Sequence, residues 1–488
     1  MRFLNKTMFA VGVVLTAISL HGCKKLVEVS APVNSLNSAN VYTNDATAIA
    51  VLTYMYANMS AINSGSSIPT SLFLFGGLSA DELTLYDINN AKYRPYYINA
   101  LANTVLTTDF WRSTYPLVFQ ANAAIEGLSA SSSLTPAVKQ QLLGEAYFLR
   151  AFYYFDLVNL YGDVPLALTT DYRVNNSLSR TPSTRVWQQI VTDLHMAQSL
   201  LSNNFLDGTL LKTTTERVRP NKWAATALLA RSYLYTNNWV GADSAATALI
   251  SNSAMFNLGT FTGSTRIFAK NSPETIWALQ GVGSNPPTSS STVNTGEGLT
   301  FVLPSSGPNT SGTYPVYLSN TVLGAFEVGD LRKINWINSV TVNGSTYNYP
   351  YKYQAGLTSS GSTEYSIQLR LAEQYLIRAE AEAHENKTTN SVSDLNTIRT
   401  RAGLSGYAGG TDLSSLQIAI LHERQVELFT EGAHRWFDLK RTNSIDAVMG
   451  AGGACAAKGG TWNSNWQYYP IASSELLANP NLIQNSGY

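Results

Sequence analysis

Asp81 and Glu82 are adjacent carboxylates, and a pair of carboxylates is the simplest arrangement that could carry out acid–base catalysis. In a strand, neighbouring side chains point to opposite faces, so these two would not meet over one substrate. The catalytic carboxylates of glycosidases face each other across roughly 5 to 9.5 Å. The segment LSADELTLY fits the start of a helix or a turn better, so we do not predict catalysis at this pair.

The histidines and cysteines form no recognisable catalytic or metal-binding motif. The four histidines that follow residue 23 are scattered along the chain, at His195, His384, His422 and His434. Two of them precede a glutamate, but neither has a second histidine four residues later, as the zinc-peptidase motif requires. Lys458 precedes a glycine instead of following one, so GGACAAKGGT is not a phosphate-binding loop. Cys455 has no recognisable partner. We therefore predict that the protein is not an enzyme and has no metal site.

Aromatic side chains outside the helical segments are better candidates for binding a ligand. With 27 Tyr, 17 Phe and 9 Trp, the chain has many flat apolar rings that could dock on the C–H face of a sugar while amides bind its hydroxyl groups. The candidates are Tyr86, Tyr93, Tyr96, Tyr97, Tyr314, Tyr317, Tyr347, Tyr349, Tyr351, Tyr353, Trp462 and Trp466. Packing is the favoured role residue by residue. Tyr86, Tyr314 and Tyr317 are the first candidates for ligand contacts.

The composition excludes nucleic-acid binding. The chain has 488 residues, with 32 basic and 32 acidic side chains and zero formal charge. Charged residues make up 13%, about half the average of roughly 25%. Nucleic-acid binding needs clustered Lys and Arg, which this composition does not provide. Apolar residues at 44% are enough for a large core, and the length would allow about three domains.

The first 23 residues indicate export and lipid attachment. Arg2 and Lys6 precede an uncharged apolar stretch that ends at Leu20, which is long enough for a signal peptide but too short to span a bilayer. The segment Leu20-His21-Gly22-Cys23 is similar to a bacterial lipobox, which predicts a signal peptide at residues 1–22 and lipid on Cys23. The alternative is an ordinary secretory peptide with an incidental cysteine. A lipidated Cys23 would leave Cys455 without a disulfide partner.

Helical periodicity predicts a mainly α fold. In residues 138–161, apolar side chains recur every three or four positions, as on one face of a helix. Further helical segments are expected at residues 110–128, 184–201, 221–251, 365–385, 391–402 and 413–430. Residues 221–251 and 365–402 resemble tetratricopeptide helix pairs, which stack into a solenoid. Five tryptophans in helical contexts are expected in the core: Trp111, Trp187, Trp223, Trp239 and Trp436.

The helical regions, at about residues 40–255 and 365–445, are separated by a loop-rich insertion at about residues 256–364. Gly, Ser, Thr, Asn and Pro are concentrated in residues 281–320, which is typical of loops. Short strands are expected at residues 274–280 and 347–353, where Pro350 limits the second to an edge or loop. A helical frame with long loops favours a binding site on the loops.

Five segments together resemble the SusD/RagB family of surface lipoproteins from Bacteroidota. They are the start at Cys23, the stretch EAYFLRA through YGDVPL, the stretch LRLAEQYLIRAEAEA, the motif ERQVEL with EG and HRWFDLKR, and the final segment from YPI to Tyr488. These segments keep the family order over nearly all of residues 23–488. The lysines that follow Cys23 depart from the acidic pair often linked to surface export.

The resemblance implies a single domain at residues 23–488, a tetratricopeptide-like helical scaffold, and no catalysis. It implies a lipid-anchored outer-membrane protein at the cell surface that captures oligosaccharide and delivers it to a SusC-like TonB-dependent transporter. The alternatives are capture of peptide, or a helical scaffold that binds proteins and no small ligand. No cofactor is expected, although the sequence leaves open whether Ca²⁺ assists. Charged residues within the helical patterns are expected to join helices as buried ion pairs.

Overall fold

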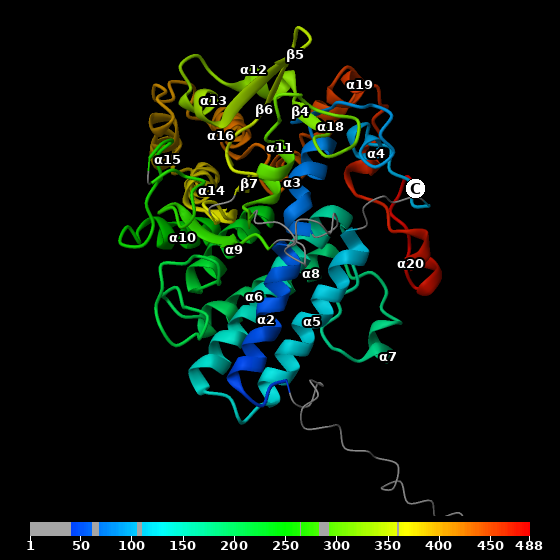
Figure 1. Ribbon diagram of the computed structural model, residues 1–488, viewed down its shortest axis with the longest axis vertical. Helices are drawn as coiled ribbons and strands as arrows, with labels where there is room; N and C mark the ends of the chain where they lie inside the picture. The colour runs from blue at the N-terminus through cyan, green and yellow to red at the C-terminus, as the bar shows by residue number, and fades with distance from the viewer. Residues whose placement is uncertain (1–40, 61–67, 105–109, 264, 283–291, 359–360) are drawn as a thin grey trace, which may run out of the picture.

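Helices dominate the structure, and the mainly α prediction is confirmed. The computed structural model describes residues 41–60, 68–104, 110–263, 265–282, 292–358 and 361–488 (Figure 1). The expected signal peptide and the lipid-bearing Cys23 lie outside these residues. Within the described ranges, no helix combines the length and the apolar character needed to cross a membrane.

The first half of the chain forms long helices that pack against one another (Figure 1). They are α2 (Asp45–Ser60), α3 (Ile68–Ser79), α5 (Phe110–Ala130), α6 (Pro136–Tyr161) and α8 (Ser183–Leu200). Helix α6 lies at the centre and is buried almost all round from Val138 onward, between α5 and α8. It begins with Pro136, whose fixed φ suits a first turn, and ends at Gly162, which has a φ of +73°.

Short helix pairs complete the scaffold. They are α9 (Lys222–Tyr235) with α10 (Trp239–Ile250), α14 (Leu371–His384) with α15 (Thr388–Arg401), and α16 (Leu413–Leu428) with α17 (His434–Arg441). Asn221 caps α9 by accepting from two backbone N–H groups of its first turn. Helix α10 packs directly on α14, and Ala242 and Ala246 share a buried cluster there with Ala381. The small side chains let the helices approach closely, as the tetratricopeptide-like prediction required.

The strands are short and pair two by two. The antiparallel pairs are β1 (Leu83–Leu85) with β4 (Val316–Leu318), β2 (Thr275–Leu279) with β8 (Ser366–Arg370), β3 (Thr292–Val293) with β7 (Leu357–Thr358), and β5 (Ile337–Val342) with β6 (Ser345–Pro350). The strand expected at residues 274–280 is confirmed as β2. The strand expected at residues 347–353 begins earlier, as β6, and ends at Pro350.

Short helices and turns connect these elements. They are α4 (Arg94–Tyr97), α7 (Tyr172–Asn175), α11 (Gly296–Phe301), α12 (Asn320–Ala325), α13 (Leu331–Trp336), α18 (Ile445–Met449), α19 (Ala454–Ala457), a 3₁₀ turn (Ser464–Gln467) and α20 (Ser473–Ala478). Strands β4, β5 and β6 lie at the upper end of the molecule, beside α12 and α18 (Figure 1).

The helix expected from residue 365 onward begins later than predicted. Residues 366–370 form β8, in which Ile367 lies opposite Ala278 and Leu369 lies opposite Trp277 of β2. Both faces of the strand are buried, so its sequence lacks the alternation of apolar and polar residues by which a strand is distinguished from a helix. Pairing with β2 decides its conformation.

Contacts between residues far apart in the chain hold the two helical regions together. The Ser79 and Tyr469 hydroxyl oxygens lie 2.8 Å apart, and Lys458 Nζ donates to the Leu78 carbonyl oxygen at 2.7 Å. Arg231 of α9 binds Glu373 of α14 through two bonds of 2.6 Å. These contacts join helices before residue 235 to segments after residue 366.

Candidate functional site

Three tyrosines from three separate segments of the chain form an aromatic cluster. Tyr86 follows β1, Tyr317 lies in β4 and Tyr347 lies in β6. The ring centroids of Tyr86 and Tyr347 are 5.7 Å apart at 78°, and those of Tyr317 and Tyr347 are 5.2 Å apart at 74°. Both contacts are edge-to-face, which is a favourable arrangement of aromatic rings. Backbone pairing fixes the cluster, because Tyr86 donates its N–H to the Pro315 carbonyl oxygen at 2.9 Å.

The tyrosine cluster, defined as Tyr86, Tyr317 and Tyr347, is accessible from solvent. Tyr86 is 40% exposed, and the other two side chains are partly exposed. None of the three hydroxyl groups makes a hydrogen bond to the part of the chain that the structure describes. Partial burial and the neighbouring tyrosines raise the pKa of Tyr317, so its hydroxyl stays protonated at neutral pH. The cluster therefore offers apolar ring surface and neutral hydroxyl groups to a ligand.

The other aromatic candidates make no ring contact with this cluster. Tyr314 occupies a turn, where its carbonyl oxygen accepts from the Asn309 N–H at 3.0 Å, and its ring makes no aromatic contact with a described residue. Five tyrosines are buried: Tyr93, Tyr96, Tyr97, Tyr349 and Tyr353. Trp462 and Trp466 use their indole N–H groups on Asp446 and on the Gly487 carbonyl oxygen. Tyr347 is one of the twelve aromatic candidates but not one of the three first candidates. Its contacts with Tyr86 and Tyr317 depend on how the strands pair, which the local sequence does not show.

The charged residues within the helical patterns are buried ion pairs, as predicted. The pairs are Glu145–Arg219, Arg150–Asp193, Arg231–Glu373, Arg378–Asp394, Glu380–Arg441, Glu423–Arg332, Arg424–Asp438 and Glu427–Arg370. Their shortest N–O distances are all 2.6 or 2.7 Å, and every side chain in them is at most 18% exposed. Most of these pairs join two helices, whereas Arg219 and Arg370 join a loop and β8 to a helix, and none of the pairs is available to a ligand.

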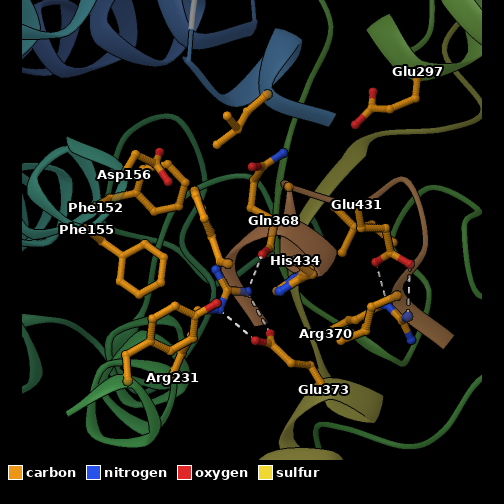
Figure 2. Close-up of a pocket in the computed structure, with 16 residues that line it drawn as sticks. Phe152, Phe155, Asp156, Arg231, Glu297, Gln368, Arg370, Glu373, Glu431 and His434 are labelled. Atoms are coloured by element: carbon orange, nitrogen blue, oxygen red, sulfur yellow. Dashed lines mark hydrogen bonds and ion pairs between the residues drawn. The ribbon is translucent and has the colours of Figure 1, made fainter. Parts of the chain in front are cut away.

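A small polar cavity lies among these ion pairs. It is bounded by α6, α9, α11, β8 and α17, and its walls include the Arg231–Glu373 and Arg370–Glu431 pairs, which are drawn with dashed lines in Figure 2. Its volume of about 30 Å³ would hold roughly two water molecules. The cavity is too small for a sugar, so we assign it to buried water.

Two carboxyl groups facing this cavity are protonated more easily than usual. Burial raises the pKa of Asp156 to about 8, and no described group donates a hydrogen bond to its carboxylate. Burial also raises the pKa of Glu297 to about 7; one of its oxygens accepts from the Ser366 hydroxyl at 2.6 Å. His434 also lines this cavity (Figure 2), and burial holds its pKa well below the ordinary value. Close to neutral pH, therefore, this cavity has little net charge.

Asp156 should make the stability of the protein depend on pH. Between the unfolded pKa of about 3.9 and the folded value of about 8, the folded state retains a proton that the unfolded state releases. This contribution to stability is fully present below the unfolded pKa and is lost as pH rises through the folded pKa. Because asparagine cannot ionise, Asp156→Asn should gain stability relative to the wild type from pH 5 to 8, by at most about 1.4 kcal/mol per pH unit.

Urea unfolding of both proteins at several pH values measures this difference. The matched control is Asp171→Asn on the surface, where Arg173 holds the pKa of Asp171 below its ordinary value. The free energy of unfolding of the control should differ from that of the wild type by the same amount at every pH above 5. If the difference between Asp156→Asn and the wild type is also the same at every pH, Asp156 ionises with its ordinary pKa.

Asp81 and Glu82 lie in the turn between α3 and β1, as expected, and both are buried. Arg435 binds Asp81 through bonds of 2.8 and 2.7 Å. Glu82 accepts from the Thr430 N–H at 3.1 Å, and burial, followed by the charge of Asp81, raises its pKa to about 8. The pair contacts backbone and arginine, so its geometry is that of a structural junction.

The isolated cysteine and the histidines also have structural surroundings. Cys455 is buried, its Sγ lies 3.4 Å from the Ile98 carbonyl oxygen, and burial raises the pKa of its thiol, which disfavours the nucleophilic thiolate. His195 lies 3.0 Å from the Tyr233 hydroxyl, and His384 stacks on Trp239. Across the described ranges, no group of three or more His, Cys, Asp or Glu side chains is arranged to hold a metal ion.

Comparison with solved structures places the chain in a known fold. A SusD superfamily protein from Bacteroides vulgatus has a TM-score of 0.75 and 20% identity, over 91% of this chain and 99% of that chain. A laminarin-binding SusD-like protein has a TM-score of 0.71 and 22% identity, over 92% of this chain and 100% of that chain. The architecture is therefore that of the SusD superfamily.

The sequence comparisons identify the family. Residues 273–488 match the family model described as "SusD family", and residues 34–234 match the model described as "Starch-binding associating with outer membrane". The SusD-like protein P2 of Formosa agariphila is 27% identical over 97% of this chain and 98% of that protein. The chain belongs to the SusD/RagB family, as its motifs indicated.

Proposed function

We propose that the protein is a cell-surface lipoprotein, anchored to the outer membrane through Cys23, that binds a neutral oligosaccharide at the tyrosine cluster. It delivers the bound glycan to a SusC-like TonB-dependent transporter and does not alter it chemically. The observation that carries the proposal is the set of three edge-to-face tyrosines with unbonded hydroxyl groups. A glycan-binding family model and a solved relative named for laminarin binding support the ligand class.

The arrangement suits an uncharged, ring-shaped ligand. A tyrosine ring buries the apolar face of a sugar, and its hydroxyl bonds the sugar's own hydroxyl groups. The strong charges described above pair with each other inside the protein, so they exert little attraction on a ligand at this site. We therefore expect the affinity to change little with salt concentration.

Replacing Tyr86 and Tyr317 together by alanine should weaken glycan binding at least about tenfold, which corresponds to about 1.4 kcal/mol. The reason is that the double variant removes two of the three rings that contact the sugar. Affinity gels and calorimetry with laminarin and starch measure the loss, at low and high salt. The melting temperature should stay close to that of the wild type.

The matched control is Tyr172→Ala, because Tyr172 is 69% exposed on α7, away from the cluster. Equal loss in the control, or a steep fall of affinity with salt, would contradict binding at the tyrosine cluster. Binding of peptides with no response to any glycan would indicate the peptide-capturing alternative. Binding only to proteins would indicate a scaffold.

The partner is tested separately: affinity purification of the protein from outer-membrane extracts should retain a TonB-dependent transporter.

A further inference from the structure

A second pocket lies where the ends of several helices meet, away from the tyrosine cluster. It is formed by the start of α10, the end of α14, the first turns of α16 and the segment after α17. Its volume of about 440 Å³ lies within the roughly 300–1,000 Å³ range of small-molecule sites. None of the residues that line it belongs to the tyrosine cluster.

The wall of this helix-end pocket is a stacked aromatic pair. The rings of Trp239 and His384 lie 3.7 Å apart and are parallel within 4°. The side-chain amide nitrogen of Gln417 lies 2.9 Å from His384 Nε2. Burial lowers the pKa of His384, which keeps the ring neutral at pH 7. The wall is thus flat, held in place and uncharged.

The charged side chains at the pocket are already neutralised. Glu380 and Arg441 form two bonds of 2.6 and 2.8 Å, and Arg441 also binds Asp438 at 2.8 Å. The side chains of Glu380 and Arg441 are only 3% and 7% exposed. A charged ligand would have to break this pair, which is costly once the groups are buried. The pocket therefore favours a neutral ligand.

Neutral polar groups around the pocket are free to bind such a ligand. The side chains of Trp239, Ser414 and Asn443 make no hydrogen bond to any residue that the structure describes. Ile418, 69% exposed, adds apolar surface at the rim. An indole N–H, a hydroxyl, an amide and an apolar edge are the groups that recognise hydroxyl groups and C–H faces in the same molecule.

We propose that the helix-end pocket is a second, independent binding site for a neutral saccharide, with the Trp239–His384 pair as its aromatic wall. This site goes beyond the proposed function, because it shares no residue with the tyrosine cluster. Two sites on one chain would bind one long glycan more tightly than either site alone, through effective concentration.

Fluorine NMR of the full chain labelled with 5-fluorotryptophan tests the proposal. Trp239→Phe assigns the Trp239 signal among the nine tryptophans. The probes are laminarihexaose and maltohexaose, titrated separately. At least one should shift the Trp239 signal saturably, both in the wild type and in the Tyr86→Ala, Tyr317→Ala double variant. No shift of this signal with either probe, or a shift that never saturates, overturns the proposal.

Ser414→Tyr provides a blocking variant that leaves the stacked pair intact, because Ser414 is exposed at the rim. It should weaken the Trp239 response at least tenfold without changing the melting temperature. Trp223 is the matched control signal, since its indole N–H donates to the Asn203 carbonyl oxygen outside this pocket. A Trp239 response that survives in Ser414→Tyr, or disappears in the tyrosine double variant, overturns an independent site. If instead the tyrosine cluster does not bind glycan, so that the proposed function is wrong, calorimetry should give the same glycan affinity for the tyrosine double variant as for the wild type.

Discussion

Replacing Glu427 with alanine should lower the free energy of unfolding by roughly 3–5 kcal/mol, the cost of breaking a buried ion pair. Glu427 lies in α16 with a fully buried side chain, where it contacts Arg370 at 2.6 Å, Arg332 at 3.0 Å and also Arg401. Burial alone would raise the pKa of Glu427, but these arginines hold it well below its ordinary value. Alanine would leave three buried guanidinium groups short of a negative charge.

Chemical unfolding of the wild type, Glu427→Ala and Glu427→Gln measures this cost. The glutamine variant keeps the shape and removes the charge, so it separates electrostatics from packing. Arg173→Ala is the control: its ion pair with Asp171 is on the surface, where solvent screening leaves such a pair with little effect on stability. If Glu427→Ala is as stable as Arg173→Ala, the ion pairs between Glu427 and its three arginines do not hold the fold together.

Arg435→Ala should destabilise the protein by a similar amount, about 3 kcal/mol. It would remove the ion-pair partner of the Asp81 carboxylate, whose side chain is 1% exposed and lies beside the buried Glu82. In an Asp81→Asn background the same substitution should cost less than half as much, because the carboxylate that Arg435 neutralises is then absent. Thermal melting and urea unfolding of the wild type, Arg435→Ala, Asp81→Asn and the double variant measure the interaction free energy between Arg435 and Asp81.

The Arg435 series also separates structure from ligand binding. A structural ion pair predicts a lower melting temperature for Arg435→Ala, with glycan affinity retained by the fraction that stays folded. Unchanged melting together with lost glycan binding would reverse the assignment and place Arg435 at a ligand site.

Local sequence was sufficient for the long helices and for β2, but not for β8. Residues 138–161 were predicted from their periodicity and form α6, which begins at Pro136 because proline suits a first turn. Residues 366–370 were predicted as helix, and they form β8 because β2 supplies the hydrogen bonds. Because β8 is buried on both faces and leads directly into α14, its own sequence does not show where the strand ends and the helix begins.

The candidate site was predicted in part. The sequence indicated that tyrosines in loops were the best candidates, and Tyr86 and Tyr317 do lie together. Tyr347 joins them because β4 lies against both β1 and β6, which no local pattern shows. Tyr314 lies only three residues before Tyr317, yet its ring makes no aromatic contact with a described residue. The buried ion pairs were expected as a class, whereas their partners depended on the tertiary fold.

The bonds that join distant segments have a consequence for how this gene can vary. Two family models divide the chain between residues 234 and 273, but Arg231–Glu373, Asp81–Arg435 and Ser79–Tyr469 all connect the two sides. A chimera made by a crossover in that interval would combine partners that did not evolve together. Recombination between divergent relatives should therefore yield folded protein chiefly when both members of each pair are inherited from one parent.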